Sequence, residues 1–281
     1  MTPPASRSPA VVATAGALAC VVLLAITGVA ALLVPAARAR DAAALHGFTR
    51  LDQTRLESLV SDIAHLADPL PYGVASLALI AVAAWRGRWG LVALLPVLLL
   101  GSAVTTRTLK HALAEPRVVD FLGGDQIGAA SWPSGHATAA MALALGAVLV
   151  APPRHRPAIA LAGAAFAAAV AYSVLVLAWH FPSDVLGGFL VAGAWALGVV
   201  AVLARFEREP GPRAPRASWQ AAGVLLTLGA AAMLAAVTGA AARHPAAATV
   251  ALSHPSFVAV AVAVAALAAT VTLGVSRAVE T

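Results

Sequence analysis

Six side chains that can take part in acid–base or nucleophilic chemistry lie between positions 110 and 184 of the chain. They are two histidines, one carboxylate, two cations and one serine: His136, His180, Asp184, Lys110, Arg117 and Ser134. Asp184 follows His180 by four residues, so its carboxylate can accept from one ring nitrogen and leave the other nitrogen free to attack. His136 is then available as a general acid. The set indicates phosphoryl transfer through a histidine, without a metal.

The segment that leads into His136 has the residues of a helix start that can bind an anion. Ser131 is expected to cap this helix. Gly135 lets the backbone come close to a ligand. The unpaired N–H groups and the positive end of the helix dipole favour a phosphate-like anion. Lys110 and Arg117 bring two further positive charges to the same place.

The composition places this chemistry in a membrane protein. Of the 281 residues, 61% are apolar and 11% are charged, whereas soluble domains average about 45–50% and about 25%. A soluble enzyme could not cover its surface with so few charges, and disorder needs low hydrophobicity. The net charge of +6 is typical of cytoplasmic loops that face anionic lipid, so it does not indicate nucleic-acid binding. Cys20 is the only cysteine, which excludes an intramolecular disulfide.

Eight apolar segments approach the length of about 20 residues that a spanning helix needs. They are 10–34, 72–86, 90–110, 133–151, 157–179, 184–204, 219–241 and 255–275. The first resembles a signal peptide in its flanks, but it is longer than the about 7–15 residues of a signal-peptide core, so we expect a retained span. The prediction is an all-α fold, a polytopic helix bundle of six spans followed by two C-terminal spans.

Arginines predict the orientation of these spans. They are concentrated in short turns such as 85–88 and 153–156, and short cytoplasmic loops are rich in Arg and Lys. Both termini are therefore predicted to be cytoplasmic. The span ends that carry the six reactive side chains then all lie at the outer face. Apolar residues recur with helical spacing in 36–70, which indicates either amphipathic helices on the outer interface or a plain packing lid.

These residues resemble the motifs of the type 2 phosphatidic acid phosphatase family, the membrane relatives of the vanadium haloperoxidases. The family pattern is Lys, six residues and Arg-Pro, then Pro-Ser-Gly-His, then Ser-Arg, five residues, His, three residues and Asp. The first block is present as Lys110 and Arg117, the second is complete at 133–136, and the third ends in His180 and Asp184.

The resemblance implies a role for each matching residue. It implies four phosphate-binding residues, Lys110, Arg117, Ser134 and Gly135. His180 would be the nucleophile that forms a phosphohistidine, Asp184 would orient it, and His136 would protonate the leaving oxygen. Water would then release inorganic phosphate, with no cofactor. Substrates in such families are lipid phosphates and polyprenyl phosphates or pyrophosphates, undecaprenyl pyrophosphate among them, presented from the outer leaflet.

Two positions depart from the family pattern. Val118 stands where proline is usual, which should alter only the path of the loop. Val174 replaces the third-block arginine, a phosphate ligand in the family, and the loss of one charge-assisted hydrogen bond weakens binding by about 10- to 150-fold. Arg107 precedes Lys110 by three residues and so shares a similar helix face. We expect Arg107 to substitute in part.

The chain is predicted to consist of three regions. Residues 1–204 form a six-span phosphatase-like core, 205–218 a cytoplasmic linker, and 219–281 a C-terminal helix pair. The expected function is hydrolysis of a lipid-linked phosphate monoester or pyrophosphate at the outer face of a bacterial cytoplasmic membrane, with membrane lipids as the other partners. Two alternatives stay open: a catalytically silent protein that binds or moves a lipid phosphate, suggested by Val174, and a phosphotransferase that uses another acceptor.

Overall fold

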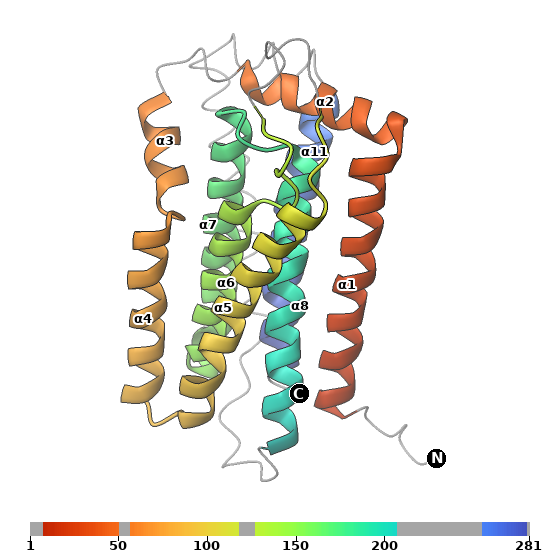
Figure 1. The fold of residues 1–281 in the computed structure, drawn as a ribbon. Coiled ribbons are helices and arrows are strands. Elements are labelled where there is room, and N and C mark those ends of the chain that lie inside the picture. The colour runs from red at the N-terminus through yellow and green to blue at the C-terminus, as the bar shows by residue number, and fades with distance from the viewer. Residues whose placement is uncertain (1–7, 51–56, 118–126, 207–254, 280–281) are drawn as a thin grey trace.

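The computed structural model describes residues 8–50, 57–117, 127–206 and 255–279, and every regular element in these four stretches is helical. The all-α prediction is therefore confirmed for the described part of the chain. Most of the helices run roughly parallel or antiparallel to one another as a bundle (Figure 1). The predicted span 219–241, most of the predicted linker 205–218, and Val118 lie outside the described residues.

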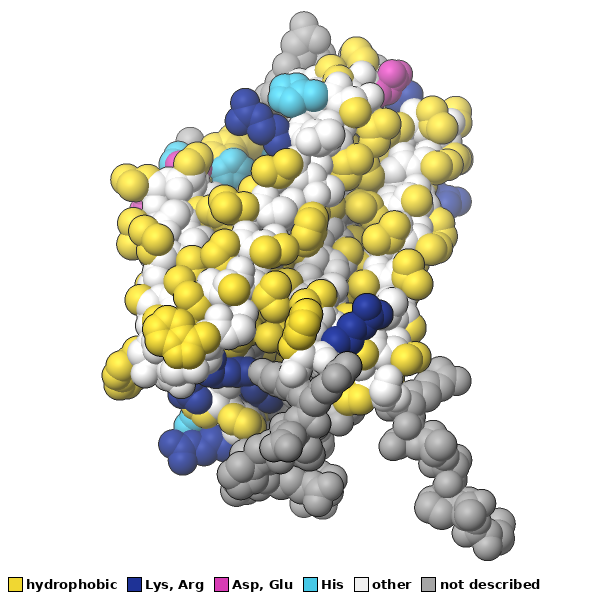
Figure 2. Space-filling model, turned by 60° about the horizontal axis from the view of Figure 1, so that its bottom comes forward, with side chains coloured by type: hydrophobic (Ala, Val, Ile, Leu, Met, Phe, Trp, Pro, Cys, Tyr) yellow, Lys and Arg dark blue, Asp and Glu magenta, His cyan; other side chains and the backbone are white. Residues whose placement is uncertain are grey.

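Five helices in the described stretches are long and apolar enough to cross a membrane. They are α1 (Pro9–Leu33), α5 (Trp89–Ala112), α7 (Arg156–Val176, preceded by the short 3₁₀ helix η2 at Pro153–His155), α8 (Pro182–Phe206) and α11 (Pro255–Ala278). They match five of the predicted spans to within a few residues. Hydrophobic side chains cover the flank of the bundle, and most of the charged side chains visible in this view lie toward its two ends (Figure 2).

Two other predicted spans form helices that are shorter than these five. The first, α4 (Pro69–Trp85), follows α3 (Glu57–His65), and the axes of the two helices differ by 51°. The second, α6 (Gly135–Val150), is buried along most of its length, because it packs against α5, α7 and α8. A helix enclosed by its neighbours does not have to meet lipid along its whole length, so 16 residues suffice here.

The start of α6 differs from the sequence prediction by a few residues. Ser134 is its N-cap, and the Ser134 hydroxyl oxygen accepts from the Ala137 N–H at 3.3 Å. The prediction that Ser131 caps this helix is wrong, because the Ser131 hydroxyl accepts from Arg117 instead.

Helix α8 brings the site together because α1, α5, α6 and α11 all pack against it. Gly188 makes the contact with α6 possible. A Cβ atom at Gly188 would lie 2.7 Å from the Ser134 carbonyl oxygen and 2.9 Å from the Thr138 nitrogen. Only a glycine lets the backbones of the two helices come this close.

Two helices lie in the region predicted to be interfacial. Helix α2 (Pro35–Thr49) lies across the end of the bundle (Figure 1) and contacts α11 through Phe48 and Phe257, whose ring centres are 4.6 Å apart. Helix α11 also packs against α7, where the Tyr172 hydroxyl donates to the Ala261 carbonyl at 2.6 Å. The last described helix is therefore packed into the same bundle as α7 and α8.

Candidate active site

The four segments that carry the predicted reactive side chains lie at one end of the bundle, beneath α2 (Figure 1). They are the end of α5, the start of α6, the end of α7 and the start of α8. This clustering follows from the alternating direction of successive helices. The start of α1 lies at the opposite end (Figure 1).

His180 and Asp184 form a buried pair between α7 and α8. The His180 Nδ1 lies 3.3 Å from the Asp184 Oδ2, and the same carboxylate oxygen accepts from the Phe181 N–H at 3.0 Å. Burial lowers the pKa of His180, and the attraction of Asp184 for the protonated ring offsets this only in part. The ring is therefore neutral at pH 7, with its proton on Nδ1 beside the carboxylate. This tautomer leaves the Nε2 lone pair for attack.

Arg117 lies behind Asp184, away from the residues that line the polar pocket described below. Its guanidinium donates to the Asp184 Oδ1, and it donates to the Ser131 hydroxyl at 2.6 Å. The group stacks over the Phe181 ring at 4.0 Å and is only 6% exposed. In this arrangement Arg117 fixes the carboxylate that orients His180. The expectation that Arg117 contacts phosphate gains no support from its position.

Asp41 on α2 completes this network, and the sequence analysis missed it. One Asp41 oxygen accepts from the Ser183 N–H at 3.0 Å, at the start of α8. The other accepts from Arg117 at 3.3 Å. Burial, followed by repulsion from Asp184, raises the pKa of Asp41 to about 6. Asp41 lies in a segment with no catalytic motif, so only the packing of α2 onto the site identifies it.

His136 faces His180 across the site, and the two ring centres are 6.3 Å apart. The His136 Nε2 lies 3.1 Å from the Asp68 Oδ1, at the start of α4. The Trp179 ring also neighbours His136, at 5.3 Å between ring centres. Asp68 is a second functional candidate that the sequence analysis missed. The two histidines are close enough to contact different atoms of one phosphate group.

A pocket of about 490 Å³ lies between α4, α5 and α6 and reaches both histidines. Its ionisable lining consists of Asp68, Arg107, Lys110, His136 and His180, and hydroxyl groups come from Tyr72, Ser102, Thr106 and Thr138. Arg107 and Lys110 therefore share one face of α5, toward the pocket. Cationic side chains beside two imidazoles make this a suitable site for an anion.

The remaining predicted phosphate-binding residues differ in their placement. Gly135 lines the pocket, and a Cβ there would meet nothing within 4 Å. Ser134 is fully buried and caps α6, so it shapes the helix start without lining the pocket. Val174 is fully buried in the hydrophobic core. The cations that line the pocket thus come from α5.

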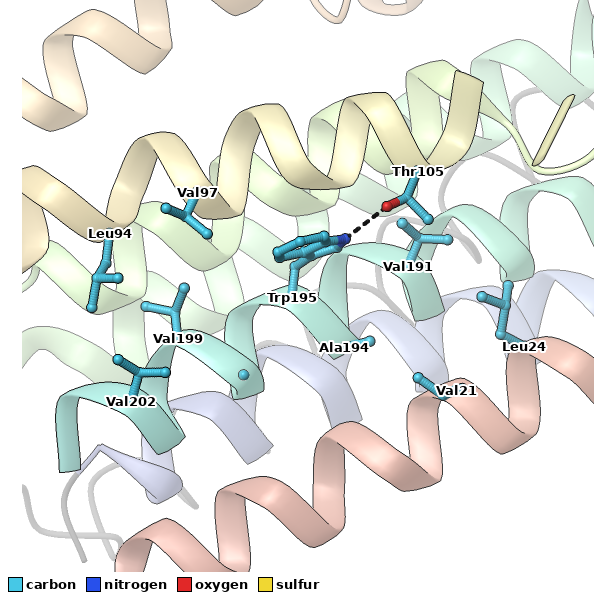
Figure 3. Close-up of a pocket in the computed structure, with 11 residues that line it drawn as sticks. Val21, Leu24, Leu94, Val97, Thr105, Val191, Ala194, Trp195, Val199 and Val202 are labelled. Atoms are coloured by element: carbon cyan, nitrogen blue, oxygen red, sulfur yellow. Dashed lines mark hydrogen bonds between the residues drawn. The ribbon is translucent and has the colours of Figure 1, made fainter. Parts of the chain in front are cut away.

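A second cavity, of about 460 Å³, lies between α1, α5 and α8 and is apolar (Figure 3). Its most polar lining groups, Trp195 and Thr105, are hydrogen-bonded to each other at 3.1 Å. Its lining, drawn from the described residues, contains no ionisable side chain. Of these two cavities, only the polar pocket has ionisable side chains in its described lining.

Comparison with known proteins agrees with this arrangement. Residues 90–208 match the PAP2 superfamily, and this range contains both histidines and Asp184. No curated protein matches the sequence significantly. The fold is similar to the crystal structure of a transmembrane PAP2 type phosphatidylglycerolphosphate phosphatase from Bacillus subtilis, with a TM-score of 0.55 and 21% sequence identity. That likeness covers 69% of this chain and 99% of the other. Residues 90–208, here called the family core, thus match the PAP2 superfamily, and the helix bundle shares the fold of a membrane PAP2 protein.

Proposed function

We propose that this membrane protein hydrolyses a lipid-linked phosphate, with His180 as the nucleophile. The observation that carries the proposal is the pair of imidazoles 6.3 Å apart at a pocket that Lys110 and Arg107 also line. The match of residues 90–208 to the PAP2 superfamily supports phosphatase activity on lipid phosphates in general. The phosphohistidine route and the absence of a cofactor are parts of the proposal.

The first step transfers the phosphoryl group to the protein. The His180 Nε2 attacks phosphorus while Asp184 holds the Nδ1–H, and an N–P bond forms as the bond from phosphorus to the lipid oxygen breaks. His136, protonated at this stage, gives its proton to that leaving oxygen. Lys110 and Arg107 stabilise the charge on the phosphoryl oxygens.

The second step returns the protein to its starting state. Water attacks the phosphorus of the phosphohistidine, the N–P bond breaks, and neutral His136 accepts the proton that the water loses. Inorganic phosphate leaves with the oxygen of that water. His180 is again neutral and His136 is again protonated, so the two steps balance without an added reactant.

We further propose that the site faces the non-cytoplasmic side of a cell membrane, with both chain termini on the other side. The short turns at the end of the bundle opposite to the site carry Arg86, Arg88, Arg154 and Arg156, which supports this orientation through the arginine bias of cytoplasmic loops. A substrate would then reach the pocket from the outer leaflet.

The experiment is a phosphate-release assay on the detergent-purified full chain. The panel contains phosphatidate, phosphatidylglycerophosphate, undecaprenyl phosphate and undecaprenyl pyrophosphate, each tested with and without a chelator. We expect release from at least one lipid, unaffected by the chelator and abolished in His180→Ala. Equal release by wild type and His180→Ala on all four lipids would favour the silent lipid-binding alternative. A new phosphorylated lipid formed when an acceptor alcohol is added would favour the phosphotransferase.

A further inference from the structure

Asp68 gives His136 a carboxylate partner from outside the family core. The Asp68 Oδ1 lies 3.1 Å from the His136 Nε2, and Asp68 precedes the matched residues 90–208. Both side chains line the polar pocket. The site therefore contains two histidine–carboxylate pairs, His180 with Asp184 and His136 with Asp68.

The local sequence explains why the Asp68 carboxylate is available. Asp68 is the N-cap residue of α4, yet its side chain makes no capping hydrogen bond. An N-cap aspartate usually accepts from the N–H of the second or third helical residue. In α4 the third residue is Pro71, which has no N–H. The carboxylate instead turns to His136 across the pocket.

The charges around His136 show what this carboxylate can contribute. Burial of the ring, Lys110 and the His65 ring oppose a positive charge on His136, and Asp68 favours it. Arg107 is a further cation that lines the same pocket. Asp68 is the one carboxylate among the described residues that line the pocket. Its contact with the His136 Nε2 also restrains the ring, which the Trp179 ring neighbours.

We propose that Asp68 is the positioning residue of the general acid: it holds the His136 ring in the orientation that delivers a proton to the leaving oxygen. The inference rests on the proposed function, because it assigns a partner to the acid of that reaction. When the bond from phosphorus to the lipid oxygen breaks, the proton of His136 passes to that oxygen. In the second step Asp68 stabilises the charge that His136 gains from water.

The test compares two leaving groups. A lipid alkyl phosphate needs a proton on its leaving oxygen, whereas an alkyl-tailed nitrophenyl phosphate releases a stable phenolate without one. We expect Asp68→Asn to lower kcat/KM for the lipid phosphate by about 10- to 100-fold, within the range of general acid catalysis. With the nitrophenyl substrate the loss should be less than about 3-fold. His136→Ala should show the same selectivity with a larger loss, and Asp68→Glu should restore part of the activity.

Asp62→Asn is the matched control, because Asp62 is an exposed acid on the adjacent helix α3. It should leave both substrates unaffected. Equal losses by Asp68→Asn on both substrates, or no loss on either, would overturn the inference while leaving the proposed function in place. Failure of the proposed function looks different, because His180→Ala would then match wild type on both substrates.

Discussion

The two histidine–carboxylate pairs differ in how they are built. His180 and Asp184 are four residues apart and buried, and the Phe181 amide and Arg117 also hold the carboxylate. His136 and Asp68 are 68 positions apart, and their side chains are 25% and 36% exposed. The buried pair is fixed in one geometry before substrate arrives, which suits a nucleophile. The open pair lies where a leaving lipid and an incoming water have access, which suits a group that gives and then takes a proton.

The largest expected effect comes from breaking the buried pair. Asp184→Asn removes the carboxylate that sets the His180 tautomer, and we expect a loss of kcat on the order of 10⁴-fold. The substitution also leaves Arg117 without its closest charge partner, and breaking a buried ion pair costs about 3–5 kcal/mol. Activity assays together with thermal unfolding in detergent measure both effects. If Asp184→Asn loses no more activity than Asp68→Asn, the proposed difference between the two pairs is wrong.

A second substitution, at Gly188, changes the contact between α6 and α8 and so the relative position of the two histidine–carboxylate pairs. Gly188→Ala places a methyl group 2.7 Å from the Ser134 carbonyl oxygen, and helix backbone cannot move aside as a flexible side chain can. We expect a destabilisation of about 1–3 kcal/mol, a lower Tm and a lower kcat. Gly198→Ala is the matched control on the same helix, since a Cβ there meets nothing within 4 Å. Similar Tm values for the two variants would show that α6 and α8 are not in tight contact.

The pH dependence of kcat/KM tests whether the buried His180 attacks as a neutral ring. Burial lowers the pKa of His180 from its ordinary 6.5, and attack needs the neutral ring. The loss of kcat/KM on acidification should therefore have its midpoint below pH 6.5, after correction for the ionisation of the substrate. An acid midpoint above pH 6.5 would mean that the ring is protonated more easily than its buried position allows.

The last expected effect concerns stability alone, through Asp41, which connects α2 to the buried pair. Because the pKa of Asp41 is raised to about 6 from the ordinary 3.8, the folded protein binds a proton that the unfolded chain releases over this range. The stability of wild type relative to Asp41→Asn should therefore fall as the pH rises from about 4 to about 6, and change little above that. Thermal unfolding of both proteins between these pH values measures it. A relative stability that rises over the same range would contradict the burial of this carboxylate.

The sequence predicts the parts of the site that are local in the chain. Four-residue spacing predicts the pair of His180 and Asp184, and the alternating direction of the spans places His136 at the same end. Asp41 and Asp68 escape prediction because their partners lie far along the chain, at Ser183 and His136. No spacing rule connects such residues before the helices are packed.

The same limit applies to Arg117 and to the short spans. The motif predicts that Arg117 lies at the site. Only packing shows that its guanidinium donates to Asp184 and Ser131. Hydropathy predicts apolar helices at 72–86 and 133–151. The first observed helix, Pro69–Trp85, begins three residues earlier, at the bend after α3. The second, Gly135–Val150, is shorter than predicted because its neighbours enclose α6.

The central claim is that His180 carries the phosphoryl group during turnover, and trapping that group tests it most directly. The full chain is mixed with lipid radiolabelled in its phosphate, quenched in alkaline detergent within one turnover, and digested to locate the label. We predict label on the peptide containing His180, stable to alkali, lost in acid and absent from His180→Ala. Turnover by wild type with label absent from that peptide, or label retained by His180→Ala, would contradict the account.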